Sequence, residues 1–153
     1  KVRNRGVEIE AQWRPSRQLE LGATLGYLDA KYINYANPDG TNFNGNRVVL
    51  TPKQSIGVNA TWRAGNGFYA RADVMRYSDY YFNRENTQRQ SGYTMVNAKI
   101  GYQGNDWEVF AFGENLAGAH YYERMFPGTM YSNLQFGSPE KPRRFGVGAR
   151  FTF

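Results

Sequence analysis

Two stretches of the sequence gather tyrosine and arginine side chains that could bind a ligand. The first holds Tyr77, Tyr80, Tyr81, Arg84 and Arg89, and the second holds Tyr121, Tyr122, Arg124 and Tyr131. Phenol rings stack on flat aromatic groups, and guanidinium groups donate charge-assisted hydrogen bonds to anionic oxygens. The combination suits an anionic metal chelate that carries catechol- or phenolate-type rings, so these residues are the candidate ligand contacts.

The sequence contains few residues that could carry out catalysis or bind a metal ion. Glu8 and Glu10 lie two positions apart, but no nucleophile accompanies them. The chain has no Cys and a single His, His120, so we expect neither a metal centre nor a cofactor. The formal net charge is +6, yet the basic residues are dispersed, which disfavours nucleic acid as a partner. We therefore expect a binding protein and not an enzyme.

The elements that must position these residues are predicted to be strands. Apolar residues occupy alternate positions in about seven stretches, which is the pattern of strands with one apolar and one polar face. A mean hydropathy of -0.71 reflects this alternation, and no apolar run is long enough for a membrane helix. The stretches are 6–13, 18–27, 55–62, 68–75, 93–102, 107–122 and 144–153. In 107–122 the facing is ambiguous, because Phe110 and Phe112 share a face with Glu108 and Glu114.

Connections between these strands alternate between short and long. Short turns are expected at 15–17, 64–67 and 104–106, and long loops at 29–52, 83–90 and 125–142. Short turns on one rim and long loops on the other are typical of bacterial outer-membrane barrels. The sequence therefore predicts an all-β fold, a portion of an antiparallel up-and-down transmembrane β-barrel that supplies about seven strands of a larger barrel.

All three tryptophans of the chain lie near the predicted short turns. Trp13, Trp62 and Trp107 could form an aromatic girdle, because indole rings prefer the boundary between membrane and water. The alternative is that tryptophan simply occurs at strand ends in many β proteins. With the first interpretation, the last strand ends at the periplasmic rim with Phe153.

The final strand resembles the C-terminal strand of TonB-dependent receptors. In that resemblance its alternate apolar residues, Phe145, Val147, Phe151 and Phe153, look like the signal read by the barrel-assembly machinery. Residues 4–11 (NRGVEIEA) and 107–122 are similar to two further strands of the family, although Ala117-Gly118 replaces a Phe-Asp pair. Residues 45–52 (GNRVVLTP) resemble a segment of siderophore receptors, the pesticin and yersiniabactin receptor group among them.

The resemblance implies a barrel of about 22 strands closed around a plug. It implies import of a ferric siderophore or similar iron chelate across the outer membrane of a Gram-negative bacterium, driven by the TonB complex through the plug. Residues 1–153 would be the C-terminal part of the barrel, with the plug domain absent from this chain. Lipid and lipopolysaccharide would surround it, and the candidate ligand contacts could instead pair with lipopolysaccharide phosphates.

Two other classes of protein stay open at this point. A small self-contained outer-membrane barrel of about eight strands, an adhesin or structural protein, would need one more strand, from the region of Tyr32 to Tyr35. A soluble ligand-binding barrel would turn its apolar faces inward and pack them together.

Overall fold

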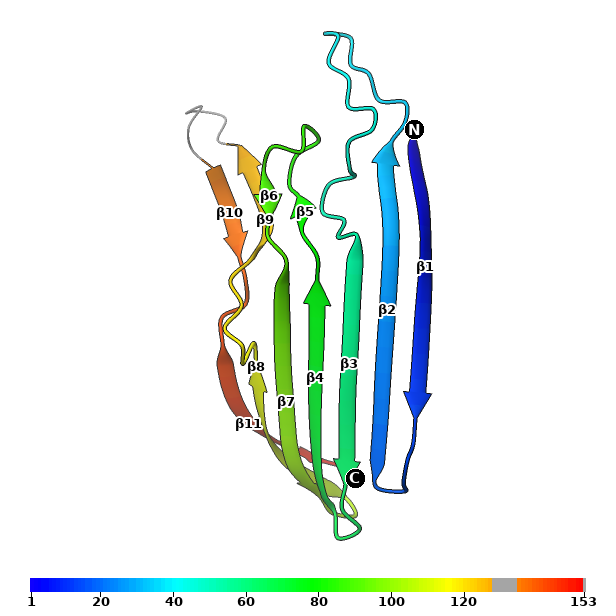
Figure 1. The fold of residues 1–153 in the computed structure, drawn as a ribbon. Helices are drawn as coiled ribbons and strands as arrows, with labels where there is room; N and C mark the ends of the chain where they lie inside the picture. Colours follow the sequence, from blue (N-terminus) through cyan, green and yellow to red (C-terminus); the bar gives the residue numbers. More distant parts are fainter. Residues whose placement is uncertain (128–134, 153) are drawn as a thin grey trace.

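Seven long strands form one antiparallel sheet in the computed structural model, which describes residues 1–127 and 135–152 (Figure 1). Each strand pairs with the next long strand along the chain, so the sheet is an up-and-down meander. The strands in sheet order are β1 (Val2–Trp13), β2 (Leu19–Tyr32), β3 (Gln54–Arg63), β4 (Phe68–Tyr77), β7 (Tyr93–Gln103), β8 (Trp107–Glu114) and β11 (Arg144–Phe151). The predicted fold class, an all-β antiparallel portion of a barrel, is confirmed.

The register places one row of apolar residues from each long strand on a common face of the sheet. Ala60 of β3 lies opposite Ala72 of β4, which lies opposite Ala98 of β7. Because paired residues of antiparallel strands share a face, such rows run across the sheet. This face is uncovered: Phe145 is 72% exposed and Val147 is 84% exposed. The predicted alternation is therefore correct, and its apolar side has no protein packed against it within the described residues.

The facing of β8, which the sequence left open, follows from its pairing with β11. Trp107 and Val109 lie opposite Phe151 and Ala149 on the apolar face, so Glu108, Phe110 and Phe112 take the polar face. Glycines in β11 make room for the two rings. An added Cβ at Gly148 would lie 2.5 Å from the Phe110 ring.

Charged side chains on the polar face pair with one another. Lys99 Nζ lies 2.7 Å from Glu108 Oε1, and it also sits 3.7 Å from the centre of the Phe110 ring. Arg71 binds Asp73 through its Nε and Nη atoms. These pairs are partly exposed, as expected for a face that meets water.

The connections alternate as predicted, with short turns at one end of the sheet and long loops at the other (Figure 1). Two of the long loops contain short strand pairs: β5 (Tyr80–Tyr81) with β6 (Arg89–Gln90), and β9 (Tyr122–Pro127) with β10 (Gln135–Pro139). They extend beyond the sheet at the long-loop end (Figure 1). Alternation of residue types does not reveal these pairs, because β5 and β6 are only two residues long and both sides of β9 and β10 carry mixed residues.

The buried apolar side chains of the described residues lie at this same end. They are Ala30, Tyr32, Phe43 and Tyr80. Among the described residues the middle of the sheet has no dry core, unlike a soluble carrier, in which the apolar faces would pack together. Within the described residues no helix is long and apolar enough to cross a membrane.

The sheet is open, with β1 and β11 at its two ends and no pairing between them among the described residues. The region between Tyr32 and β3 adds no eighth strand, since it makes only isolated bridges, between Ala36 and Asn42 and between Arg47 and Lys31. The seven strands are thus a piece of a larger wall and do not close a small barrel.

Candidate ligand-binding site

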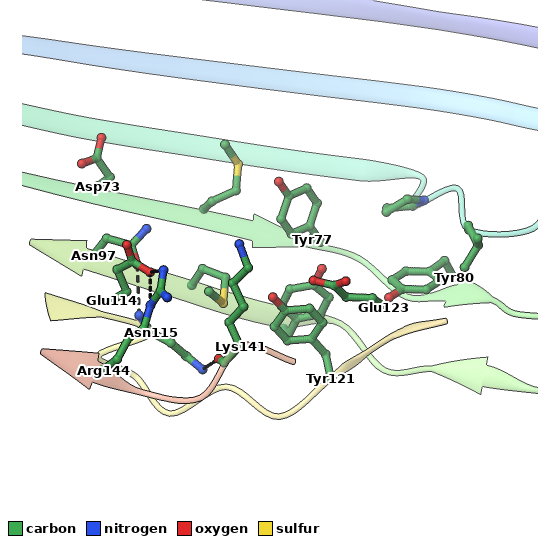
Figure 2. A pocket seen from close by; sticks show the side chains of 15 residues that line it. Asp73, Tyr77, Tyr80, Asn97, Glu114, Asn115, Tyr121, Glu123, Lys141 and Arg144 are labelled. Carbon is green, nitrogen blue, oxygen red and sulfur yellow. Dashed lines mark hydrogen bonds and ion pairs between the residues drawn. The ribbon is translucent and has the colours of Figure 1, made fainter. Parts of the chain in front are cut away.

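A cavity of about 740 Å³ lies on the polar face of the sheet toward the long loops (Figure 2). Its floor comes from β4, β7, β8 and the first residue of β11, and its sides come from three long loops. The lining residues are Leu50, Pro52, Asp73, Met75, Tyr77, Tyr80, Tyr93, Met95, Asn97, Glu114, Asn115, Tyr121, Glu123, Lys141 and Arg144. In Figure 2 the labelled tyrosines gather at one end, and Asp73, Asn97, Glu114 and Arg144 gather at the other.

The tyrosines form a stacked group. The rings of Tyr93 and Tyr121 are parallel to within 2° with centroids 4.0 Å apart, and Tyr77 lies 5.3 Å from Tyr93. Tyr80 is buried and donates a hydrogen bond from its hydroxyl to the carbonyl of Tyr122 at 2.6 Å. Offset and parallel rings at these distances attract one another, so the group is a ready platform for a further flat ring.

The phenol of Tyr121 is held in its neutral form. Burial raises its pKa, and the negative charges of Glu123 and Glu140 raise it further. Since an ordinary tyrosine already titrates near pH 10, this phenol stays protonated under physiological conditions. It can therefore donate a hydrogen bond to a ligand oxygen, and it is poorly suited to bind a bare ferric ion as phenolate.

Charges in the lining nearly balance. Three carboxylates, Asp73, Glu114 and Glu123, face two cations, Lys141 and Arg144. Arg144 is ion-paired with Glu114. The cavity is therefore polar without being strongly positive.

Asn115 fixes the loop that follows β8. Its side chain is 1% exposed, donates hydrogen bonds to the carbonyls of Ala119 at 3.0 Å and Lys141 at 3.1 Å, and accepts one from the amide of Ala119 at 2.8 Å. Its own amide donates to Asn97 Oδ1 at 3.0 Å. Because Asn tolerates the left-handed backbone better than most residues, it suits the φ of 49° found here. Asn115 thus ties both arms of the last long loop to β7.

Arg47 makes the closest ion pair between two of the long loops. Its guanidinium donates to Asp79 Oδ2 at 2.8 Å, to the Asp79 carbonyl at 2.7 Å and to the Thr51 carbonyl at 3.4 Å. Arg89 Nε donates to the same Asp79 Oδ2 at 3.0 Å. Partial burial alone would raise the pKa of Asp79, but the bonds from Arg89 and Arg47 outweigh it and hold that pKa below its ordinary value.

Three of the candidate ligand contacts, Tyr77, Tyr80 and Tyr121, line the cavity, and five do not. Tyr81 lies beneath the Arg47 guanidinium, 5.2 Å from it, and Arg84 lies 5.1 Å from the Tyr35 ring. Arg89 binds Asp79, while Tyr122 and Arg124 are exposed on β9. For all of these residues, those that line the cavity included, ligand contact stays a prediction. Tyr131 lies outside the described residues.

Tyr93 is the main lining residue that the sequence does not single out. It begins β7, and its ring meets Tyr121 only because the last long loop folds back over the sheet. A signal was present, since Tyr93 alternates with the apolar residues of its strand. The pairing that joins it to Tyr77 is a long-range contact that alternation alone does not specify.

The three tryptophans lie at the short-turn end on the apolar face. Trp13 and Trp62 are opposite Leu21 and Leu19 of β2, and Trp107 is opposite Phe151. Their exposed fractions are 65%, 45% and 42%.

The last strand presents the residues of the proposed assembly signal on the same face. Phe145, Val147 and Phe151 are all exposed there. Phe153 lies outside the described residues.

An open antiparallel meander with an uncovered apolar face, short turns at one end and a polar cavity at the other defines this chain as a segment of a large β-barrel wall. The chain belongs to the TonB dependent receptor-like β-barrel family, whose model matches residues 1–116. It is 24% identical over 152 residues to the pesticin receptor of Yersinia pestis, and it spans 97% of its own length but only 22% of that relative.

Solved structures of receptors share the fold. The ferric yersiniabactin uptake receptor FyuA from Yersinia pestis matches with a TM-score of 0.84 and 21% identity, covering 99% of this chain and 24% of that one. The siderophore receptor PiuA from Acinetobacter baumannii matches with a TM-score of 0.80 and 18% identity, covering 98% of this chain and 22% of that one. The chain therefore corresponds to about a quarter or less of the structures it resembles.

Proposed function

We propose that this chain is the C-terminal barrel part of an outer-membrane TonB-dependent receptor that imports ferric siderophores in a Gram-negative bacterium. The observation that carries the proposal is the tyrosine-lined cavity on the polar face, at the long-loop end of a barrel wall of this family. The structural neighbours include a ferric yersiniabactin uptake receptor, a siderophore receptor and a ferric preacinetobactin receptor, which supports the same class of ligand here.

The two faces of the sheet fit the two surroundings that this function requires. Exposed residues such as Val58, Ile100 and Val147 would meet lipid, and the tryptophans would lie at the periplasmic boundary. Lipopolysaccharide would surround the upper part of the wall, near the long loops. The ion-paired polar face would then line a wet interior.

A ferric chelate would enter from the long-loop side and lay an aromatic group against Tyr121, with Tyr77 and Tyr80 beside it. The neutral Tyr121 phenol would donate a hydrogen bond to an oxygen of the chelate. Binding and passage need no bond making, so the chain would act as a transporter and not as an enzyme.

Two further partners follow from the proposal. Energy would come from the TonB complex through a plug domain that is not among these residues. The apolar row of β11, with Phe145, Val147 and Phe151 exposed, would be read by the barrel-assembly machinery during insertion.

Uptake of radioactive iron tests the function directly. The full-length receptor would be expressed in a Gram-negative strain lacking its own siderophore receptors, with and without TonB, and supplied with ferric yersiniabactin, ferric preacinetobactin or a ferric catecholate. We expect TonB-dependent uptake of at least one chelate. Uptake of none, in cells whose outer membrane contains the folded receptor, would contradict the proposal.

A further inference from the structure

Residues 45–52, here called the strap, lie between β2 and the β5–β6 pair. On one side the strap bonds to β2, where the amide of Val48 donates to the Ala30 carbonyl at 3.0 Å. On the other side the amide of Leu50 donates to the Tyr81 carbonyl at 2.8 Å. The strap therefore bridges two elements that are not sheet neighbours, and its far end, with Leu50 and Pro52, forms part of the cavity wall.

The strap is held by its Arg47 at both backbone and side chain. The backbone amide of Arg47 donates a hydrogen bond to Asn86 Oδ1 at 2.7 Å, and Asn86 Nδ2 donates one to the Arg47 carbonyl at 3.0 Å. The Arg47 side chain, 15% exposed, reaches across to Asp79 and back to the carbonyl of Thr51. A planar guanidinium that donates to three acceptors fixes geometry as well as charge.

Leu50 adopts a backbone conformation that leucine rarely takes. Its φ is 55°, in the left-handed region where a branched side chain is disfavoured. Such a conformation persists only when the surroundings enforce it. Here the enforcing contacts are its own bond to Tyr81 and the anchored residues on either side, Arg47 and Thr51.

We infer that Arg47, clasped to Asp79, is a positioning residue that fixes the strap so that Leu50 walls the cavity and sets which chelates fit it. The inference has two halves. The positional half, that Arg47 fixes the strap, depends only on contacts within the chain. The other half, that the strap determines which chelates bind, rests on the proposed function.

Amide hydrogen exchange on the full-length receptor tests the positional half. In Arg47→Gln we expect exchange within residues 45–52 to rise about tenfold or more, because the strap opens more often. Arg47→Lys should give an intermediate rise, since an ammonium can pair with Asp79 but cannot also span to the Thr51 carbonyl. Arg89→Gln is the matched control, because it removes a bond to the same carboxylate without touching the strap. Unchanged exchange in Arg47→Gln would overturn the clasp.

Affinity for ferric yersiniabactin tests the other half. Arg47→Gln should weaken binding about tenfold, and Leu50→Ala should weaken it severalfold while leaving strap exchange unchanged. Arg63→Gln, at the short-turn end, should leave the affinity unchanged, and heat-dependent gel mobility should show that every variant is folded. Faster strap exchange with unaltered affinity would overturn the positioning role. If the unmodified receptor binds no ferric yersiniabactin, the inference about chelates is overturned, while uptake of the other chelates still decides the proposed function and the exchange result still decides the clasp.

Discussion

Replacing Asn115 by alanine should destabilise the barrel wall by about 3 kcal/mol. The change removes three side-chain hydrogen bonds, those to the amide and carbonyl of Ala119 and to the carbonyl of Lys141. Three bonds at about 1 kcal/mol net each give a total of about 3 kcal/mol. Opening of the last long loop before global unfolding would lower the observed value, so the figure is an upper estimate.

Urea unfolding of the full-length receptor in lipid vesicles, followed by fluorescence, measures this change. Asn115→Asp should be at least as damaging, because it keeps one acceptor but turns an oxygen toward two carbonyl oxygens. Asn105→Ala, in an exposed short turn, is the matched control and should change the free energy of unfolding by less than about 0.5 kcal/mol. A comparably small change for Asn115→Ala would refute the role assigned to this residue.

Three further predictions concern the clasp, the cavity and the sheet. The folded pKa of Asp79 lies below its ordinary 3.8, so the stabilisation by its ion pairs is complete above pH 3.8 and is lost as the pH falls through the lowered pKa. Amide exchange in the strap, corrected for its intrinsic rate, should therefore rise only below pH 3.8. A rise between pH 5 and pH 7 would count against the pairing. Tyr121→Phe should weaken ferric yersiniabactin binding less than Tyr121→Ala does, because the phenyl ring keeps the stacking; equal losses measured by titration would exclude the stacking role. Gly148→Ala should cost about 1 kcal/mol or more in urea unfolding through its clash with the Phe110 ring, whereas Gly65→Ala, in a turn with open space around it, should cost less.

The face that each strand residue occupies was predictable, because apolar residues recur at every second position of a strand. Ala60, Ala72 and Ala98 alternate with polar residues in their own segments, and the sheet only aligns what each segment already specifies. Short turns and long loops were equally visible, since they are the gaps between alternating segments. The segment around Phe110 remained ambiguous because its polar face carries rings, and the glycines that accommodate them lie on a different strand.

The candidate site was predictable only in part. Aromatic residues in or beside long loops are reasonable candidates for ligand binding. Three such residues, Tyr77, Tyr80 and Tyr121, line the cavity. Arg89 has the same kind of position, but it is bound to Asp79, a carboxylate ten residues away whose pairing no local pattern specifies. Arg47 lies in the motif that resembles siderophore receptors, and its clasp appears only when two loops meet.

Solvent accessibility of neighbouring strand positions tests the central claim, that one face of the sheet meets hydrocarbon and the other meets water. Spin labels would be placed singly at Ala72 and Asp73 of β4, and at Val58 and Asn59 of β3, in the full-length receptor in lipid vesicles. Labels at Ala72 and Val58 should collide mainly with oxygen, which dissolves in lipid, and labels at Asp73 and Asn59 with a water-soluble nickel complex. The reverse pattern, or equal access at adjacent positions, would contradict the account.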